Sequence, residues 1–479
     1  MESNGFFREL LERFVFEDPK RIAFSLYDGR KIVNISYSQF VNDVLTATGY
    51  FHANHIKKHH IALIAPNSYK WIVVFFAILT SGNIAVLLDS SLSPQLLQSQ
   101  CKKADVDMIY TEGAIGFELR ETFSDISFLT YNVLKNSVTI TLDSVSTSDP
   151  EDTIILIGTS GTTGKAKIAE ITSDNIRHFV ASVSCVFCTA AYEKMLLILP
   201  LHHIGGIAVV ITGLYLSKNL CIGRGVRYLF SDMPIFNPTD IALVPAILES
   251  LEKLLKLSNS SEDHKKYIGN RLQRIHVAGA SSKASSCKYL MQEGFLLNTS
   301  YGMTETTGLG TWCILDKEHI GTIGKLLDGI EARILKGELL LKGPTVISGY
   351  YRNPYETSRT IIDGWLHTGD LVSCDSNGFF YLTGRKKNVI ILSNGENVNP
   401  EDIEEFLNEC SAVLECMVYG NIKGICADIY THHRAIVETY IKAYSEKMPM
   451  YRHIYKVNYY EQPLEKTSSG KLKRKDITS

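Results

Sequence analysis

The chain has 479 residues, of which 45% are hydrophobic and 21% charged. These values are typical of a globular protein of roughly two to four domains, with enough chain for a large buried core. The formal net charge of −2 gives no electrostatic reason to expect nucleic acid or an anionic membrane as a partner.

Residues 1–14 have an amphipathic, partly acidic pattern, which predicts a helix and no secretory signal. The apolar run 71–88 is interrupted by the sequence TSGN at 80–83, so we expect a buried helix and then a buried strand instead of a membrane span. The ten scattered cysteines are typical of reduced thiols and predict a cytoplasmic protein. Cys185 and Cys188 have C-x-x-C spacing, but their small apolar neighbours favour a buried helix turn over a metal or redox site.

Apolar runs with the character of strands alternate with helical patterns through most of the chain, which indicates an α/β fold. These runs are 60–65, 85–88, 108–110, 195–199, 241–244 and 275–278.

Dense Gly- and Asp-rich turns at 363–385 precede a compact C-terminal stretch. In that stretch we expect strands at 388–392, 412–419 and 454–460 and a helix at 435–447, with another helix starting at Asn399-Pro400-Glu401. We therefore predict a large N-terminal α/β domain of several subdomains (1–385). A small, mobile α+β domain (386–479) would follow it.

The clearest motif is a buried strand, 154–157, that runs into a segment rich in Gly, Ser, Thr and Lys at 158–167. Its backbone N–H groups, hydroxyls and ammonium groups all donate to phosphate. A kinase-type phosphate loop does not fit, because Thr159 stands where the first glycine belongs and Ala166 follows Gly164-Lys165. Residues 167–172 alternate as a strand does, so we predict strand, loop and strand; a plain flexible hairpin tip is the alternative.

Two further stretches combine groups that suit a nucleotide. In 301–306, Glu305 stands beside hydroxyls, which suits Mg²⁺ bridging phosphate oxygens, and Tyr301 offers a ring to a base. The alternative there is a capped turn before a helix. Residues 364–370 predict a tight turn that presents Asp370 to two ribose hydroxyls, although an ordinary turn aspartate has the same pattern.

Two basic stretches lie later in the chain. Residues 384–387 (GRKK) predict a basic loop at the domain junction, where a solvated linker is the alternative. Residues 465–471 place Lys471 in a flexible segment, and a solvated tail is the alternative for that lysine.

These stretches follow one another in a fixed order over nearly the whole chain. The order is 67–68, 159–167, 200–203, 301–305, 343–351, 368–370, 384–385 and Lys471. In this order they resemble the adenylate-forming superfamily of acyl-CoA synthetases, luciferases and peptide-synthetase adenylation domains, and acyl-CoA ligases most of all. The resemblance implies that ATP, with Mg²⁺, activates a carboxylic acid to acyl-AMP with release of pyrophosphate.

For the nucleotide, the resemblance implies three groups of contacts. The loop that embraces the β- and γ-phosphates of ATP is Thr159, Ser160, Gly161, Thr162, Thr163, Gly164 and Lys165. Tyr301 stacks on adenine, with Gly279, Ala280 and Ser281 on its other side. Asp370 and Arg385 hold the ribose.

For catalysis, the resemblance implies that Thr304 contacts the α-phosphate and that Glu305 binds Mg²⁺. Lys471 is the mobile lysine that reaches the substrate carboxylate and the α-phosphate, where it offsets the repulsion between two anions. Lys387 is the hinge about which the small domain rotates for the second step, and Gly395 flanks the tunnel for pantetheine.

The acid is predicted to be apolar or aromatic. Members that activate amino acids carry an Asp near this motif for the ammonium group, whereas 200–206 (PLHHIGG) contains no carboxylate. His203 is expected at the end of the pocket that binds the acid carboxylate, and a histidine packed behind the pocket is the alternative. His202 replaces a commoner aromatic residue and receives no role.

The acceptor thiol is predicted to be that of CoA. The sequence departs from the family at Lys165-Ala166-Lys167-Ile168, where Lys-Pro-Lys-Gly is usual, but both lysines remain. It is also shorter than usual after Lys387, around 424–433, so the phosphopantetheine of an acyl or aryl carrier protein is an alternative acceptor. A nucleotide-binding relative without catalysis is a third possibility, against which Glu305, Asp370, Arg385 and Lys471 together argue.

Overall fold

The computed structural model describes residues 5–17, 19–113, 115–123, 125–146, 149–159, 167–187, 194–257, 261–279, 282–392, 396–421, 424–466 and 472–474. The chain divides into two compact units. The N-terminal unit comprises residues 1–161, 166–331 and 341–366, and the C-terminal unit comprises 162–165, 332–340 and 367–479. The predicted domain boundary at residue 385 stays a prediction.

The N-terminal unit contains a six-stranded sheet with the order β6-β5-β3-β4-β7-β8. Its strands are β3 (His60–Ile64), β4 (Ile84–Leu87), β5 (Met108–Thr111), β6 (Ser127–Leu129), β7 (Thr153–Gly158) and β8 (Ile168–Thr172). All neighbours are parallel except β7 and β8, because parallel strands need crossover helices whereas a short loop permits only an antiparallel return. The helices in this stretch are α3 (Tyr69–Thr80), α4 (Pro94–Lys103), α5 (Ile115–Thr122) and α6 (Tyr131–Lys135).

The apolar run at 71–88 is a buried helix followed by a buried strand, as predicted. Every residue of α3 except Lys70 is buried, and Gly82, with φ of 76°, lies in the turn between α3 and β4. Among the described residues, no helix combines the length and the apolar character that crossing a membrane requires.

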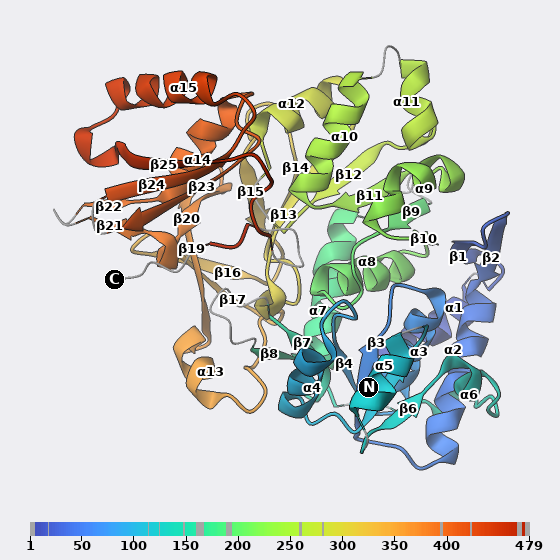
Figure 1. Cartoon of the computed structure of the whole chain (residues 1–479). Helices are drawn as coiled ribbons and strands as arrows, with labels where there is room; N and C mark the ends of the chain where they lie inside the picture. The colour runs from blue at the N-terminus through green and yellow to red at the C-terminus, as the bar shows by residue number, and fades with distance from the viewer. Residues whose placement is uncertain are drawn as a thin grey trace. The chain divides into compact units, whose positions relative to one another are not determined.

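A second sheet of the N-terminal unit has the order β15-β14-β13-β12-β11-β9-β10-β1-β2 (Figure 1). Strands β10, β11 and β12 are buried at every position, as expected for strands covered on both faces. The strands are β1 (Ile22–Tyr27), β2 (Ile32–Ser36), β9 (Lys194–Leu197), β10 (Asn219–Ile222), β11 (Asp240–Leu243), β12 (Arg274–Val277), β13 (Leu296–Tyr301), β14 (Thr311–Ile314) and β15 (Thr322–Leu326).

The remaining helices of the N-terminal unit complete its core. The helices are α1 (Phe6–Phe16), α2 (Tyr37–Ala53), α7 (Ser173–Phe187), α8 (Ile204–Tyr215), α9 (Leu229–Phe236), α10 (Pro245–Leu257), α11 (Ser261–Ile268), α12 (Ala284–Gln292) and α13 (Pro354–Thr360). Helices α2 and α3 pack on each other, and α1 buries Phe6, Phe7 and Phe14. The six predicted strands of this region, and the N-terminal helix, all coincide with observed elements.

Three groups of paired strands lie mainly in the C-terminal unit. Strands β16 (Glu331–Leu335), β17 (Glu338–Lys342), β19 (Trp365–Cys374) and β20 (Phe380–Arg385) pair in that order, and β21 (Ile390–Ile391) and β22 (Asn397–Val398) form a small sheet of their own. The short strand β18 (Ile361–Ile362) belongs to the N-terminal unit, where it pairs with Leu366 and Trp365 at the start of β19. Strands β23 (Glu415–Asn421), β24 (Gly424–Tyr430) and β25 (Ile454–Tyr460) form a three-stranded sheet, against which α14 (Pro400–Glu409) and α15 (Arg434–Lys447) pack (Figure 1). The mixed α/β fold class is confirmed.

Parts of the C-terminal prediction are wrong. Residues 386–388 form a 3-10 turn, and the strand expected at 388–392 is only β21 (Ile390–Ile391), which pairs with β22 (Asn397–Val398). Strand β24 was missed, because its residues are buried on both faces and lack the alternation that marks an amphipathic strand. The helix start at Pro400 is confirmed, although Asn399 makes no side-chain capping bond.

Candidate active site

The donor-rich loop is held at both ends by a β-hairpin. Strands β7 and β8 are antiparallel with Gly158 opposite Ile168, and Thr159 N donates to Lys167 O at 2.8 Å. A strand follows the loop, as predicted, where a kinase-type phosphate loop requires a helix. Six of the predicted phosphate contacts lie outside the described residues: Ser160, Gly161, Thr162, Thr163, Gly164 and Lys165.

Strand β8, which follows this loop, lies against the segment 349–351. Glu170 N donates to Gly349 O at 3.1 Å, and Tyr351 N donates to Ile168 O at 2.8 Å. Ala169 and Tyr350 form an antiparallel bridge between these two bonds. The GYY sequence therefore behaves as a short extra strand beside β8.

Glu305 lies on a single 3-10 turn, Thr304–Thr306, directly after β13. The turn is closed by a capping box, in which Met303 N donates to Thr306 Oγ1. Gly302 must lack a side chain, because a Cβ there would lie 2.1 Å from Gly308 O. The alternative that the sequence left open was a capped turn before a helix; the capped turn is present, but strand β14 follows it and the helix expected in that alternative is wrong.

The Glu305 carboxylate is buried and held by a tyrosine. Glu305 is 6% exposed, and its Oε1 accepts a hydrogen bond from Tyr350 Oη at 2.7 Å. On the backbone, Ile347 N donates to Glu305 O at 3.1 Å. Burial, and then the negative charge of Glu305, raises the pKa of Tyr350 above its usual value, so this hydroxyl remains a donor.

Lys167, at the end of the loop, lies over the same tyrosine. Its Nζ is 4.7 Å from the centroid of the Tyr350 ring and 2.6 Å from Glu356 Oε2. The hydrogen bond from Lys167 lowers the pKa of Glu356. Sequence reasoning assigned no role to Tyr350 or Glu356, and the only signal for Tyr350 was its place in the GPTVISGYY stretch.

Tyr301 and Gly279 lie at the carboxyl ends of two neighbouring parallel strands. Val277 of β12 pairs with Thr299 of β13, so the carboxyl ends of these strands lie at one edge of the sheet. Gly279, with φ of 90°, follows β12, and partly buried Tyr301 ends β13. Ligands of α/β proteins bind at such an edge, which suits the predicted adenine contacts. Ala280 and Ser281 lie outside the described residues.

The turn before α8 carries the two histidines. Asn67 braces it: Asn67 Nδ2 donates to Leu199 O at 2.8 Å and Leu201 N donates to Asn67 Oδ1 at 2.9 Å. His203 is the N-cap residue of α8, and its ring centroid is 4.3 Å from that of His202.

His202 faces a carboxylate that sequence reasoning missed. His202 Nε2 lies 3.6 Å from Asp89 Oδ2. Burial lowers the pKa of His202, and the attraction of Asp89 only partly opposes this effect. Burial alone would raise the pKa of Asp89, but hydrogen bonds from Ser91 and the neighbouring imidazoles lower it overall.

In the C-terminal unit, Asp370 and Arg385 form an ion pair. They are opposite each other on β19 and β20, and Arg385 Nε lies 2.6 Å from Asp370 Oδ1. The prediction of a tight turn around Asp370 and of a loop at Arg385 is wrong, because both residues belong to strands. Gly369 has φ of 72°, and a register shift follows at 371–372, so the strand accommodates the glycine as an irregularity.

A second carboxylate supports the backbone beside Asp370. Glu338 Oε1 accepts from Gly369 N at 3.1 Å, and Lys386 Nζ donates to Glu338 Oε2 at 2.8 Å. Burial would raise the pKa of Glu338, but the hydrogen bond and charge of Lys386 lower it overall. Lys387 is part of the 3-10 turn after Arg385, whereas Lys471 and Gly395 lie outside the described residues.

The donor chemistry at Glu305 fits magnesium. Magnesium in nucleotide enzymes is commonly held by one or two carboxylates together with substrate phosphates, and Glu305 supplies one such buried carboxylate. Within the described part of the chain, no group of three or more His, Cys, Asp or Glu side chains is arranged to hold a metal by itself.

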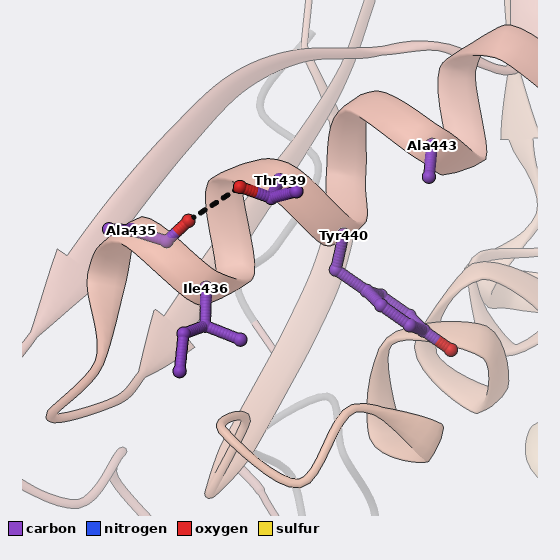
Figure 2. Close-up of a pocket in the computed structure, with 5 residues that line it drawn as sticks. All are labelled: Ala435, Ile436, Thr439, Tyr440 and Ala443. Atoms are coloured by element: carbon purple, nitrogen blue, oxygen red, sulfur yellow. Dashed lines mark hydrogen bonds between the residues drawn. The ribbon is translucent and has the colours of Figure 1, made fainter.

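A shallow apolar hollow lies along α15 in the C-terminal unit (Figure 2). Its lining residues are Ala435, Ile436, Thr439, Tyr440 and Ala443. The Thr439 hydroxyl donates to Ala435 O within the helix. No lining residue is charged, so the hollow offers phosphate no positive side chain.

The chain belongs to the AMP-binding enzyme family. Residues 11–351 match this family, and residues 387–479 match the AMP-binding enzyme C-terminal domain. The predicted membership of the adenylate-forming superfamily is therefore confirmed.

Relatives of this chain include named CoA ligases. A 2-succinylbenzoate–CoA ligase of Bacillus cytotoxicus is 29% identical over 499 residues, which cover 98% of this chain and 97% of that protein. The long-chain-fatty-acid–CoA ligase FadD15 of Mycobacterium bovis is 25% identical over 438 residues, covering 78% of this chain and 72% of that protein.

Solved structures share the fold. The O-succinylbenzoate CoA synthetase MenE of Bacillus subtilis in complex with AMP has a TM-score of 0.84 and 24% identity, with 97% of each chain covered. The anthranilate CoA ligase AuaEII in complex with anthranoyl-AMP has a TM-score of 0.86 and 19% identity, with 98% of this chain and 95% of AuaEII covered. At these identities the likeness establishes the fold alone.

Proposed function

We propose that this chain is an AMP-forming acid–CoA ligase that acts on an aromatic carboxylic acid, with 2-succinylbenzoate as the first acid to test. The observation that carries the proposal is the buried Glu305 carboxylate, which accepts a hydrogen bond from Tyr350. The backbone of Tyr350 pairs with β8, the strand that follows the donor-rich loop. Relatives matched over most of the chain are ligases that join acids to CoA, and MenE has also been solved with ATP and magnesium. A long-chain fatty acid is the second candidate, because FadD15 acts on that class.

In the first step, a carboxylate oxygen of the acid attacks the α-phosphorus of ATP. The bond from that phosphorus to the bridging oxygen breaks, and pyrophosphate leaves with the electron pair. Both reactants are anions, so positive charge is needed where they meet. We assign Lys471 to the acid carboxylate and the α-phosphate, and Thr304 to the α-phosphate. Mg²⁺ bound by Glu305 supplies further positive charge at the phosphates.

In the second step, the thiol of CoA gives its proton to solvent water and its sulfur attacks the acyl carbon. The bond to AMP breaks, and AMP leaves with the electron pair. We assign Lys387 to the hinge that permits a different surface of the C-terminal residues to serve this step, and Gly395 to the pantetheine tunnel.

The nucleotide contacts follow the same assignment. The loop from Thr159 to Lys165 takes the β- and γ-phosphates and, after the first step, the leaving pyrophosphate. Tyr301 takes one face of adenine and residues 279–281 take the other. Asp370 and Arg385 take the ribose hydroxyls, since a carboxylate has lone pairs beyond those used by one guanidinium.

The acid is assigned to the turn at 200–206, with His203 at its carboxylate. This stretch has no acidic side chain for an ammonium group, and Asp89, which the fold brings to the turn, faces His202. These features support an acid without an α-amino group. A cytoplasmic location stays a prediction, which the free cysteines among the described residues support.

The test is acid-dependent exchange between ATP and pyrophosphate with 2-succinylbenzoate, anthranilate, a long-chain fatty acid and an α-amino acid. Each acid that supports exchange is then offered CoA and, separately, a carrier protein bearing phosphopantetheine. Exchange with an aromatic acid and a CoA thioester as product supports the proposal. Exchange only with a fatty acid, transfer only to the carrier, or ATP binding without exchange would overturn it in favour of the corresponding alternative.

A further inference from the structure

The side chain of Tyr350 joins two parts of the site that sequence reasoning treated separately. Its hydroxyl donates to Glu305, and its backbone belongs to the short strand beside β8. We infer that Tyr350 is a positioning residue, which orients the Glu305 carboxylate for Mg²⁺ and fixes it relative to the end of the phosphate loop. This inference rests on the proposed role of Glu305 as the magnesium ligand.

Glu305 needs such a partner because its carboxylate is buried on a single helical turn. A desolvated carboxylate that lacks a hydrogen-bond donor is costly, and its plane would be free to rotate. The 2.7 Å bond from Tyr350 Oη to Oε1 fixes that plane, and with it the direction of the second oxygen, Oε2. Groups that orient a metal-binding side chain in this way affect metal affinity strongly even though they do not touch the metal.

Tyr350 is itself held on several sides. Its backbone N donates to Thr357 Oγ1 at 2.9 Å, and it forms the bridge to Ala169. Lys167 Nζ lies over its ring, and Tyr350 is only 3% exposed. The hydroxyl therefore has a defined position, which is set by the same strand, β8, that anchors the loop.

The adjacent residue provides a matched control. Tyr351 also donates from its hydroxyl to a carboxylate, Asp105 Oδ2, at 2.8 Å. Asp105 and Tyr351 have no part in the proposed chemistry. Tyr350→Phe and Tyr351→Phe thus remove the same atom from neighbouring positions, and both keep the aromatic ring.

The experiment is calorimetric titration of the full chain with ATP, in EDTA and at a series of Mg²⁺ concentrations. In Tyr350→Phe we expect the Mg²⁺ concentration for half-maximal enhancement of ATP binding to rise about tenfold. ATP affinity in EDTA should be unchanged, and Tyr351→Phe should behave as the unmodified chain. No shift in Tyr350→Phe, an equal shift in both variants, or an equal loss of affinity with and without Mg²⁺ would overturn the inference.

Glu305→Gln separates this inference from the function on which it rests. If the Mg²⁺ dependence shifts in both Glu305→Gln and Tyr350→Phe, the inference is supported. If it shifts in Glu305→Gln alone, Tyr350 does not position the ligand and only the present inference fails. If Glu305→Gln leaves the Mg²⁺ dependence unchanged, the proposed role of Glu305 fails, and the inference fails with it.

Discussion

Asp370 and Arg385 lie directly opposite each other on β19 and β20, with Arg385 Nε 2.6 Å from Asp370 Oδ1. A second contact joins Arg385 Nη2 to Asp370 Oδ2 at 3.4 Å. Asp370 is 1% exposed, whereas the Arg385 side chain is 40% exposed. The pair therefore combines a buried acceptor, held in place by the guanidinium, with a donor that still reaches solvent.

Replacing Arg385 with Lys should weaken ATP binding more than it weakens the fold. Lysine keeps the charge but lacks the planar fork that meets both oxygens of Asp370. We expect the KM for ATP in pyrophosphate exchange to rise about tenfold, since hydrogen bonds to charged groups contribute about 1.5–3 kcal/mol. Arg434→Lys, on a surface pair with Glu438, is the control and should leave KM unchanged. An unchanged KM in Arg385→Lys would contradict the ribose assignment.

Replacing Lys471 with Ala should abolish adenylation without abolishing nucleotide binding. The lysine is proposed to act where charge develops in the first step, and removal of one such group costs at least about 100-fold in rate. We expect that loss in acid-dependent exchange, with the Kd for ATP changed by less than about threefold, on the order of 0.6 kcal/mol.

Lys473→Ala is the matched control for Lys471→Ala. Lys473 lies two residues away and its Nζ is 3.6 Å from Glu465 Oε2. The Lys473→Ala variant should retain acid-dependent exchange between ATP and pyrophosphate. Equal losses in both variants would indicate a general effect of charge in this segment, and retained exchange in Lys471→Ala would remove Lys471 from the mechanism.

The features that sequence predicted well are those encoded by neighbouring residues. The apolar run of β7, the polar loop and the alternation of β8 are each local patterns, so strand, loop and strand could be read directly. The TSGN sequence at 80–83 likewise divided α3 from β4 correctly. Glu305 was singled out because hydroxyls surround it in sequence, and its role as a magnesium ligand stays a prediction.

The features that sequence missed depend on distant residues or on context. Tyr350 meets Glu305 across 45 positions, and no local pattern reports that contact. Asp89 meets His202 only because β4 and the turn before α8 are brought together by the fold. Asp370 was misplaced in a turn because Gly369 is a turn signal, whereas pairing with β20 keeps the segment extended.

His202 should make the protein less stable in mild acid. Its pKa lies below 6.5 in the folded chain because burial disfavours the cation. As pH falls through about 6.5, the unfolded chain binds a proton that the folded chain does not, so the free energy of unfolding decreases. His202→Gln removes this proton uptake. Its loss of stability between pH 7.5 and 5.5 should therefore be smaller, by at most about 1.4 kcal/mol per pH unit.

Urea unfolding at the two pH values measures this difference. His178→Gln is the control, because that side chain is 47% exposed and pairs with Asp174 on the surface of α7. An equal pH dependence in His202→Gln and the unmodified chain would show that His202 takes up its proton equally in both states. The pKa of His202 in the folded chain would then not lie below its value in the unfolded chain.

The position of His203 should depend on the absence of a side chain at Gly206. A Cβ at 206 would lie 2.2 Å from Pro200 O, whereas a Cβ at Gly205 would meet only Leu199 Cδ1, at 3.7 Å. Gly206→Ala must therefore displace the turn that carries His203, and we expect it to lower the free energy of unfolding by about 2 kcal/mol and to raise the KM for the acid.

Gly205→Ala separates this steric effect from the loss of glycine itself. Both residues lie in the first turn of α8, where alanine has the higher helix propensity, so Gly205→Ala should leave stability unchanged or increase it by up to about 1 kcal/mol. Thermal unfolding and the KM for the acid are measured in both variants. If the two alanines raise that KM equally, the pocket is sensitive to any change in α8 and the Pro200 contact is not the cause. If Gly206→Ala lowers the free energy of unfolding by less than expected and leaves the KM for the acid unchanged, the turn can shift without moving the acid. His203 then does not belong at the acid carboxylate.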